Sequence, residues 1–316
     1  MKKLIGLLLF AIGLYLAVFV KVPEGNDNRT KNNVNMARRM SQLGIVSLGA
    51  GTLIIAGGID LSIGSFMGLC ATVLAVGMQR QGWSPPQAIA VVLGMGVVVG
   101  LIHGLLVTKL RLPAFIVTLC GLFIYRGLAR WWAGDANAGI GPGMFKRAFS
   151  EATPLGLPVE FVYLVIAAIV FYLLLQRSIY GRYLYAIGSN ELAAKYSGIR
   201  VDRYKIFAYV LCSLTAAFYS MMHLAEVASV SPSNVGSMLE LYAIAGAVIG
   251  GCSLRGGEGN VLGIILGASI LTLLQAVVSF WDVPQSLEYA AIGGALLVGA
   301  IMDEVLRRRG PATAHG

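Results

Sequence analysis

Long apolar runs without charged side chains alternate with shorter polar segments along the whole chain. A helix needs about 20 mostly apolar residues to cross the hydrocarbon core of a membrane. Some runs are short for a straight crossing, and glycines interrupt others. The pattern predicts an all-α, polytopic membrane helix bundle with about ten transmembrane helices, forming a single domain over residues 1–316. The ten runs are 4–20, 41–59, 61–79, 81–108, 112–125, 161–176, 206–225, 241–254, 259–281 and 289–302.

The first run resembles a signal peptide, because two lysines precede an apolar core. No small-x-small cleavage site follows, since the run ends at Val20-Lys21. We therefore expect residues 1–20 to be retained as the first helix.

Composition supports a chain that lies mostly in lipid. Hydrophobic residues make up 57% of the chain and charged residues only 12%, whereas a typical soluble domain has about 25% charged residues. The net charge of +9 comes from basic residues that lie between the apolar runs. This distribution is typical of cytoplasmic loops and not of a clustered nucleic-acid-binding surface.

The basic segments predict the orientation of the chain. Lysine and arginine are concentrated in residues 177–205, in 109–111 and in 307–309. With a cytoplasmic N-terminus and ten crossings, all three segments and the C-terminus lie in the cytoplasm, as the positive-inside rule requires. Residues 133–159 then form an external loop. Residues 21–40 oppose this arrangement, because they are basic and would be external.

Two glycine-rich segments, residues 55–64 and 248–257, each separate two apolar runs. They indicate broken or re-entrant helices of the kind that line transport pathways. Their similarity is consistent with an internal repeat, or with the chance likeness of glycine-rich turns. The residues that we assign to these breaks are Gly57, Gly58, Asp60, Ser62, Gly250, Gly251, Gly256 and Gly257.

Asp60 is the most informative acidic residue. A charge at membrane depth is costly and suggests function, but Asp60 or Ser62 can also cap the next helix after a left-handed Gly57 or Gly58. We favour the cap over direct substrate contact, although broken helices can do both. His103 stands alone in an apolar run and is predicted to be a packed, neutral histidine.

Residues 185–199 predict a short amphipathic helix within the basic segment. Ser189 or Asn190 can cap it, Glu191 favours its positive end, and Gly198 can close it. Such a helix is either an ordinary surface helix or a docking element for a partner.

Several motifs occur together in one order. They are Gly-Gly-Ile-Asp-Leu-Ser at 57–62, Ala-Ile-Gly-Ser-Asn-Glu with Ser-Gly-Ile at 186–199, the glycine-rich stretch at 240–257, and Pro-Ala-Phe-Ile-Val-Thr-Leu at 113–119. With them the chain resembles the permease subunits of bacterial ABC importers for monosaccharides, of the ribose and xylose type. The family-like core spans residues 41–306. Tyr242 departs from the family, which usually has an acidic residue there.

The resemblance implies a transport subunit that is not itself an enzyme, in a bacterial inner membrane. It implies ten helices, a second permease copy (identical or related), a cytoplasmic ABC ATPase and an external sugar-binding protein. The chain has no GxxxxGK[ST] phosphate loop, so ATP and Mg are expected on the partner. The resemblance makes residues 177–205 the loop that couples to the ATPase, through Gly188, Ser189, Asn190, Glu191, Ala193, Ala194 and Gly198.

Substrate contact is expected from hydroxyl-binding side chains, with Asn137, Tyr242, Gln275 and Ser279 as candidates. The binding protein is expected near residues 133–159 and 225–240. Another small polar solute, such as a nucleoside or an amino acid, is the nearest alternative. An ion-coupled secondary transporter is a further one, with Asp60, Glu226 and Glu240 as its acids. A membrane-embedded enzyme fits least, because His, Asp, Glu and Cys residues do not cluster.

Overall fold

The computed structural model describes residues 26–151 and 156–281, with single positions near residues 12–15 and 287–297. Helices dominate, and two short strands pair antiparallel with Ala138 opposite Val230. The predicted runs 4–20 and 289–302 lie outside the described ranges. The elements are α2 (Asn26–Ile55), α3 (Ile63–Arg80), α4 (Pro85–Thr108), α5 (Ala114–Ala133), β1 (Ala138–Gly139), α6 (Met144–Ser150), α7 (Val159–Tyr172), the π-helix η1 (Leu173–Arg177), α8 (Ile179–Ser189), α9 (Glu191–Tyr196), α10 (Val201–Val227), β2 (Ser229–Val230), α11 (Leu239–Ile249) and α12 (Val261–Phe280).

Six helices in the described ranges are long and apolar enough to span a membrane. They are α3, α4, α5, α7 with η1, α10 and α12, while α11 is shorter. Each predicted run between residues 41 and 281 coincides with a helix. The expected polytopic helical bundle is thereby confirmed.

Helix α2 begins well before its apolar run. Residues 21–40 were expected to be a polar segment, yet the helix starts at Asn26. No glycine or proline interrupts residues 26–40, so the backbone can continue as a helix. Met36 is buried against Ile270 and Leu273 of α12, and this packing stabilises the polar extension.

The expected loop at 133–159 is also partly ordered into elements. It contains β1 and the seven-residue α6. Phe149 of α6 is buried and packs on the rings of Tyr163 and Phe218. These aromatic contacts order a segment that was predicted only as an external loop.

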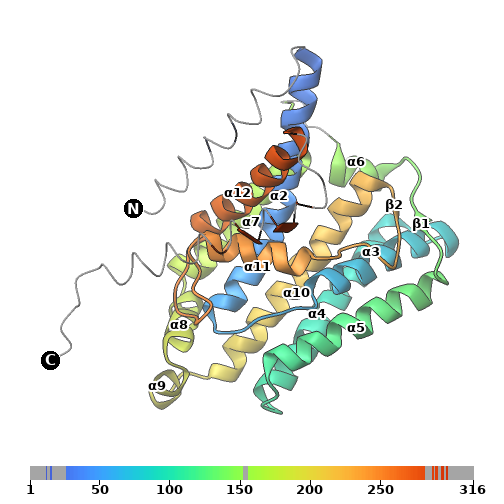
Figure 1. Ribbon diagram of the computed structural model, residues 1–316. Helices are drawn as coiled ribbons and strands as arrows, with labels where there is room; N and C mark the ends of the chain where they lie inside the picture. Colours follow the sequence, from blue (N-terminus) through green and yellow to red (C-terminus); the bar gives the residue numbers. More distant parts are fainter. Residues whose placement is uncertain are drawn as a thin grey trace.

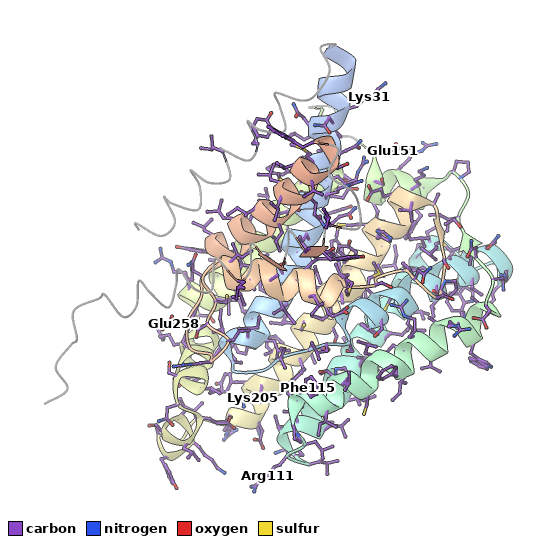
Figure 2. All side chains as sticks on the ribbon, viewed as in Figure 1. Lys31, Arg111, Phe115, Glu151, Lys205 and Glu258 are labelled. Carbon is purple, nitrogen blue, oxygen red and sulfur yellow. The ribbon has the colours of Figure 1, made fainter. Side chains whose placement is uncertain are left out.

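The two ends of the bundle carry different elements (Figure 1). Helices α8 and α9 lie at one end, and α6, β1 and β2 at the other. Figure 2 shows Arg111 and Lys205 toward the α9 end, and Lys31 and Glu151 toward the opposite one. Lys109 Nζ lies 2.6 Å from the Asp202 carboxylate. The 109–111 and 177–205 basic segments therefore share one end, as predicted.

Glycines bring α4 and α10 into backbone contact. A Cβ added at Gly104 would lie 2.7 Å from the Ile206 Cα, and one at Gly100 would overlap Val210. Gly96 continues this row, four residues earlier on the same face of α4. This arrangement follows the small-xxx-small rule of membrane helices. These three glycines thus allow close packing of the two helices.

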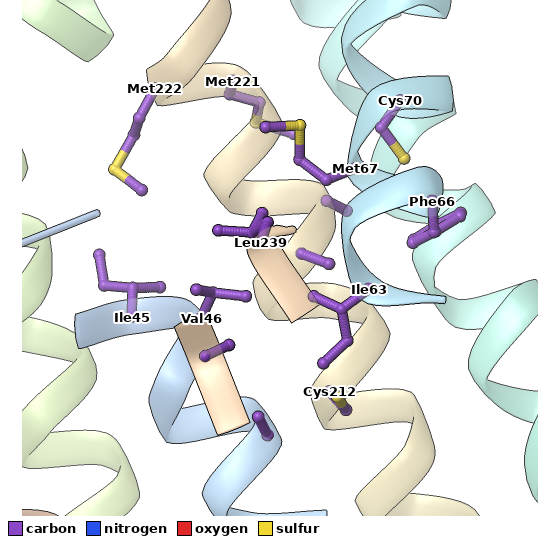
Figure 3. Close-up of a cluster of buried hydrophobic side chains, with 14 of the residues drawn as sticks. Ile45, Val46, Ile63, Phe66, Met67, Cys70, Cys212, Met221, Met222 and Leu239 are labelled. Carbon is purple, nitrogen blue, oxygen red and sulfur yellow. The ribbon is translucent and has the colours of Figure 1, made fainter. Parts of the chain in front are cut away.

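The outward faces of α4, α5 and α7 are apolar and exposed, including Val98, Phe123 and Ile169. Helix α3, in contrast, is almost entirely buried. Its residues Ile63 and Met67 meet Met221 of α10 and Leu239 of α11 in one apolar cluster (Figure 3). The exposed faces are suited to contact lipid, whereas α3 belongs to the interior.

Candidate functional site

The break between α2 and α3 is an ordered, buried turn. Gly57 has a φ of +74°, and the Gly58 amide donates to the Leu53 carbonyl at 2.9 Å. This is the Schellman ending of a helix. The Asp60 carboxylate then accepts hydrogen bonds from the Ser62 amide at 2.7 Å and the Ser62 hydroxyl at 2.6 Å. Asp60 thus forms a local turn with Ser62, the N-cap residue of α3, and neither side chain accepts from the first amides of the helix as the predicted cap required.

Asp60 also belongs to a buried polar group that the sequence does not reveal. Its Oδ2 lies 3.4 Å from Nδ1 of His103 on α4. The other ring nitrogen of His103 is 2.8 Å from the Tyr125 hydroxyl on α5. Asp60 and His103 are 3% and 2% exposed, so water cannot replace these contacts. His103 is therefore packed, as predicted, but has specific partners from two other elements.

A second carboxylate lies beside the start of α3. The Glu240 side chain of α11 approaches the backbone of Gly64. Arg126 of α5 donates to the carbonyls of Pro232 and Val235, at 3.1 and 2.6 Å. These contacts fix the loop before α11 against α3 and α5.

The break between α11 and α12 ends its first helix in the same way. Gly251 has a φ of +95°, and the Cys252 amide donates to the Ala247 carbonyl at 3.0 Å, again a Schellman ending. The Gly257 amide donates to the Ile55 carbonyl at the end of α2, at 2.9 Å. The two predicted breaks therefore lie side by side.

Gly188 of α8 packs into the same place. A Cβ at Gly256 would lie 2.9 Å from the Gly188 Cα and 3.1 Å from the Gly57 Cα. A Cβ at Gly188 itself would overlap the Ile55 carbonyl. We call this meeting of Gly57, Gly188 and Gly256 the glycine joint.

A tyrosine of α8 adds a hydrogen bond beside the glycine joint. The Tyr185 hydroxyl donates to the Gly259 carbonyl at 2.8 Å. Burial, and to a smaller extent the neighbouring Cys252, raises the pKa of Tyr185 to about 12. The hydroxyl therefore stays protonated and remains a donor at physiological pH.

Helix α9 forms where the sequence predicts it. The Asn190 side chain accepts from the Ala193 amide at 3.0 Å, and Gly198 has a φ of +84°. Glu191 pairs with Lys205 of α10 at 2.5 Å. Leu192 and Tyr196 are 67% and 89% exposed. The predicted loop residues thus form a capped helix that presents apolar side chains at the end of the bundle.

A cavity of about 330 Å³ opens between α2, α3, α10, α11 and α12. Tyr242 and Gln275, both predicted to contact substrate, line it. It is also lined by Gln42, Tyr219, Glu226 and Thr272, which no sequence pattern groups together. Glu226 lies at the last turn of the 27-residue α10, about 40 Å from its start beside α9. The cavity is therefore near the end opposite α9.

The other predicted contacts lie elsewhere. Asn137 is exposed in the turn before β1, and Ser279 is exposed near the end of α12. A larger depression of about 510 Å³ lies by β1, and its lining includes Gln79, Trp83 and backbone of residues 139–143. The Gly139 amide donates a hydrogen bond to Oε1 of Gln79 at 3.1 Å and holds this side chain in place. The pairing of β1 with β2 joins the two loops predicted to meet a binding protein.

Comparison with known proteins gives one consistent result. Residues 32–301 match the family described as the branched-chain amino acid transport system permease component. The ribose import permease RbsC of Bacillus subtilis is 33% identical over 92% of this chain and 91% of its own length. The RbsC of Escherichia coli K12 is 31% identical over 96% and 92%. The autoinducer 2 import permease LsrC of an Enterobacter species is 35% identical over 84% and 76%. No solved structure matches.

The family match covers most of the chain, and its relatives are import permeases. The apolar helices, the two breaks and the polar cavity are the features that such a subunit requires. The chain therefore belongs to this family of transport-system permease components and is a multi-pass protein of the inner membrane.

Proposed function

We propose that the chain is the transmembrane permease subunit of an ABC importer that moves a ribose-like monosaccharide across the inner membrane. The observation that carries this proposal is the similarity to two ribose import permeases over more than nine-tenths of the chain. Transport proceeds by alternating access, and ATP hydrolysis takes place on a separate subunit that holds ATP and Mg.

The proposed topology has ten helices and cytoplasmic termini. The α8–α9 end faces the cytoplasm, which agrees with the basic residues gathered there. The β1–β2 end faces outward and receives a sugar-binding protein. A second permease copy, identical or related, completes the pathway.

The proposed coupling element is α8–α9. Leu192 and Tyr196 on α9 offer an exposed apolar surface away from lipid, which suits docking of an ATPase subunit. Movement of α8 reaches both helix breaks directly through the glycine joint, because Gly188 has no side chain to separate it from Gly57 and Gly256. ATP and the loaded binding protein each shift the conformational equilibrium of the importer, because each binds one conformational state more tightly than the other.

The first experiment is purification of the intact chain, co-expressed with its partner subunits, followed by a test of ATP hydrolysis in the complex. The variant Leu192→Asp should release the ATPase, because it places a charge in the docking surface. Met144→Asp is the matched control, since Met144 is 77% exposed on α6 at the opposite end. Met144→Asp should keep the ATPase.

Uptake of labelled D-ribose into cells that lack their own ribose importer completes the test. The wild-type complex should take up ribose, and L-leucine should not compete. Competition by leucine would instead favour an amino-acid substrate, in line with the family description. Uptake by the chain alone, driven by an ion gradient, would overturn the ABC proposal in favour of a secondary transporter.

A further inference from the structure

We propose that the 330 Å³ cavity is a sugar-binding subsite within the permease, in which Glu226 and Gln42 together bind two adjacent ring hydroxyls. This inference rests on the proposed function and deepens it. It places part of the importer's selectivity in the membrane subunit, in addition to that of the external binding protein.

The Glu226–Gln42 pair is the polar centre of the cavity. Gln42 is 3% exposed, and its Nε2 donates to Glu226 Oε2 at 2.8 Å. The bond joins α10 to α2, and it fixes both planar groups in place. A carboxylate has two oxygens, and an amide has two N–H groups and an oxygen. The pair can therefore accept from one hydroxyl and donate to its neighbour while keeping its own bond.

Rings and hydroxyl-binding groups surround this pair. Tyr219 stacks on His223 with centroids 5.8 Å apart and an interplanar angle of 17°. Tyr242 lines the wall from α11, and Thr272 and Gln275 line it from α12. A sugar has an apolar C–H face and a hydroxyl edge, so it is suited to ring faces beside fixed polar groups.

Part of the cavity lining is apolar. Met67 and Leu239 line it, and Figure 3 shows both within the buried cluster around Ile63 and Met221. These side chains offer no hydrogen bonds. The polar contacts of a solute therefore come from the Glu226–Gln42 pair and the other polar lining residues.

The charge of the lining favours a neutral solute. In the described part of the chain, the lining has one arginine, Arg39, and one carboxylate, Glu226, besides the titratable His223. Arg39 is exposed, whereas Glu226 is partly buried and already bonded to Gln42. A phosphorylated sugar would bring its negative charge close to Glu226, and the repulsion would disfavour it.

The test compares uptake of D-ribose with that of 2-deoxy-D-ribose, which lacks one of the adjacent hydroxyls. Every measurement uses the complete importer with the same binding protein. Glu226→Gln should lower the ribose to deoxyribose uptake ratio about tenfold, because a neutral amide replaces the charged acceptor of the hydroxyl.

Asp135→Asn is the matched control. Asp135 is also an acid near the β1 end, but it pairs with Arg130 outside the cavity, at 2.6 Å. Its uptake ratio should be unchanged. Gln42→Leu serves as the second cavity variant if Glu226→Gln does not fold, and should lower the ratio in the same way.

Two outcomes separate this inference from the proposed function. If wild type takes up ribose and both cavity variants keep its uptake ratio, the subsite is wrong and the permease function stands. If wild type takes up no ribose, saturation-transfer NMR between D-ribose and the solubilised chain decides the inference. A signal that is lost in the cavity variants supports the subsite, and no signal in wild type overturns it.

Discussion

A buried carboxylate must keep its hydrogen-bond donors, and Asp60 obtains two of them from Ser62, two residues ahead. Both bonds are local, because they lie within the sequence Gly-Gly-Ile-Asp-Leu-Ser. The contact with His103 is different, since it spans 43 residues of sequence and depends on how α4 packs beside the break. The contacts of Asp60 with Ser62 are therefore local, whereas the partners of His103 depend on tertiary packing.

Asp60→Ala should destabilise the protein by roughly 2–4 kcal/mol, because it removes both bonds to Ser62 and leaves His103 buried without its acidic neighbour. Asp60→Asn should cost less, since an amide oxygen can still accept from the Ser62 amide. Thermal unfolding of the solubilised protein measures both. Equal midpoints for Asp60→Ala and wild type would contradict the stabilising role of the bonds between Asp60 and Ser62.

Helix α4 shows how one element presents two kinds of glycine. Gly100 contacts the backbone of Val210 on α10, whereas a Cβ at Gly94 would meet nothing within 4 Å. Both lie in the same apolar run, and hydropathy cannot distinguish them. The difference depends on which face of α4 meets α10.

Gly100→Leu should therefore destabilise the bundle by roughly 3 kcal/mol or more, because the new side chain would push α10 away from α4. Gly94→Leu makes the same chemical change on the open face and should leave stability nearly unchanged. The unfolding midpoint of each purified variant gives the comparison. Similar losses for the two variants would contradict the α4–α10 contact.

The glycine joint makes a prediction about α8. Gly188→Ala should disturb the contact with Ile55 and Gly256, since even a methyl group overlaps the backbone there. We expect ATP hydrolysis to continue in the purified complex while ribose uptake falls by tenfold or more. Gly127→Ala on α5 is the control, because that position is open. Coupled transport by Gly188→Ala would argue against the joint as the point of transmission.

At the scale of the whole molecule, the basic loops gather at one end and the paired strands at the other. The proposed topology makes the first end cytoplasmic. The sequence predicted that residues 109–111 and 177–205 lie on the same side of the membrane. Two predicted crossings, residues 112–125 and 161–176, separate them and return the chain to that side. The ion pair between Lys109 and Asp202 agrees.

Single cysteines test the orientation. In a Cys120→Ser background, which removes the exposed native thiol, Glu151→Cys should react with a membrane-impermeant maleimide added to spheroplasts. Lys195→Cys, also at an exposed position, should react only after the membrane is permeabilised. Labelling in the reverse order would invert the proposed topology.

The apolar helices, the left-handed glycine that ends α2 and the Asn190 cap of the short α9 follow from the sequence, because each depends on residues within a few positions of one another. It also predicted two of the residues that line the cavity, Tyr242 and Gln275. The contacts of Gln42 with Glu226 and of Gly188 with both helix breaks become visible in the folded protein alone. They join segments far apart in the chain, and they depend on helix packing, which hydropathy does not specify.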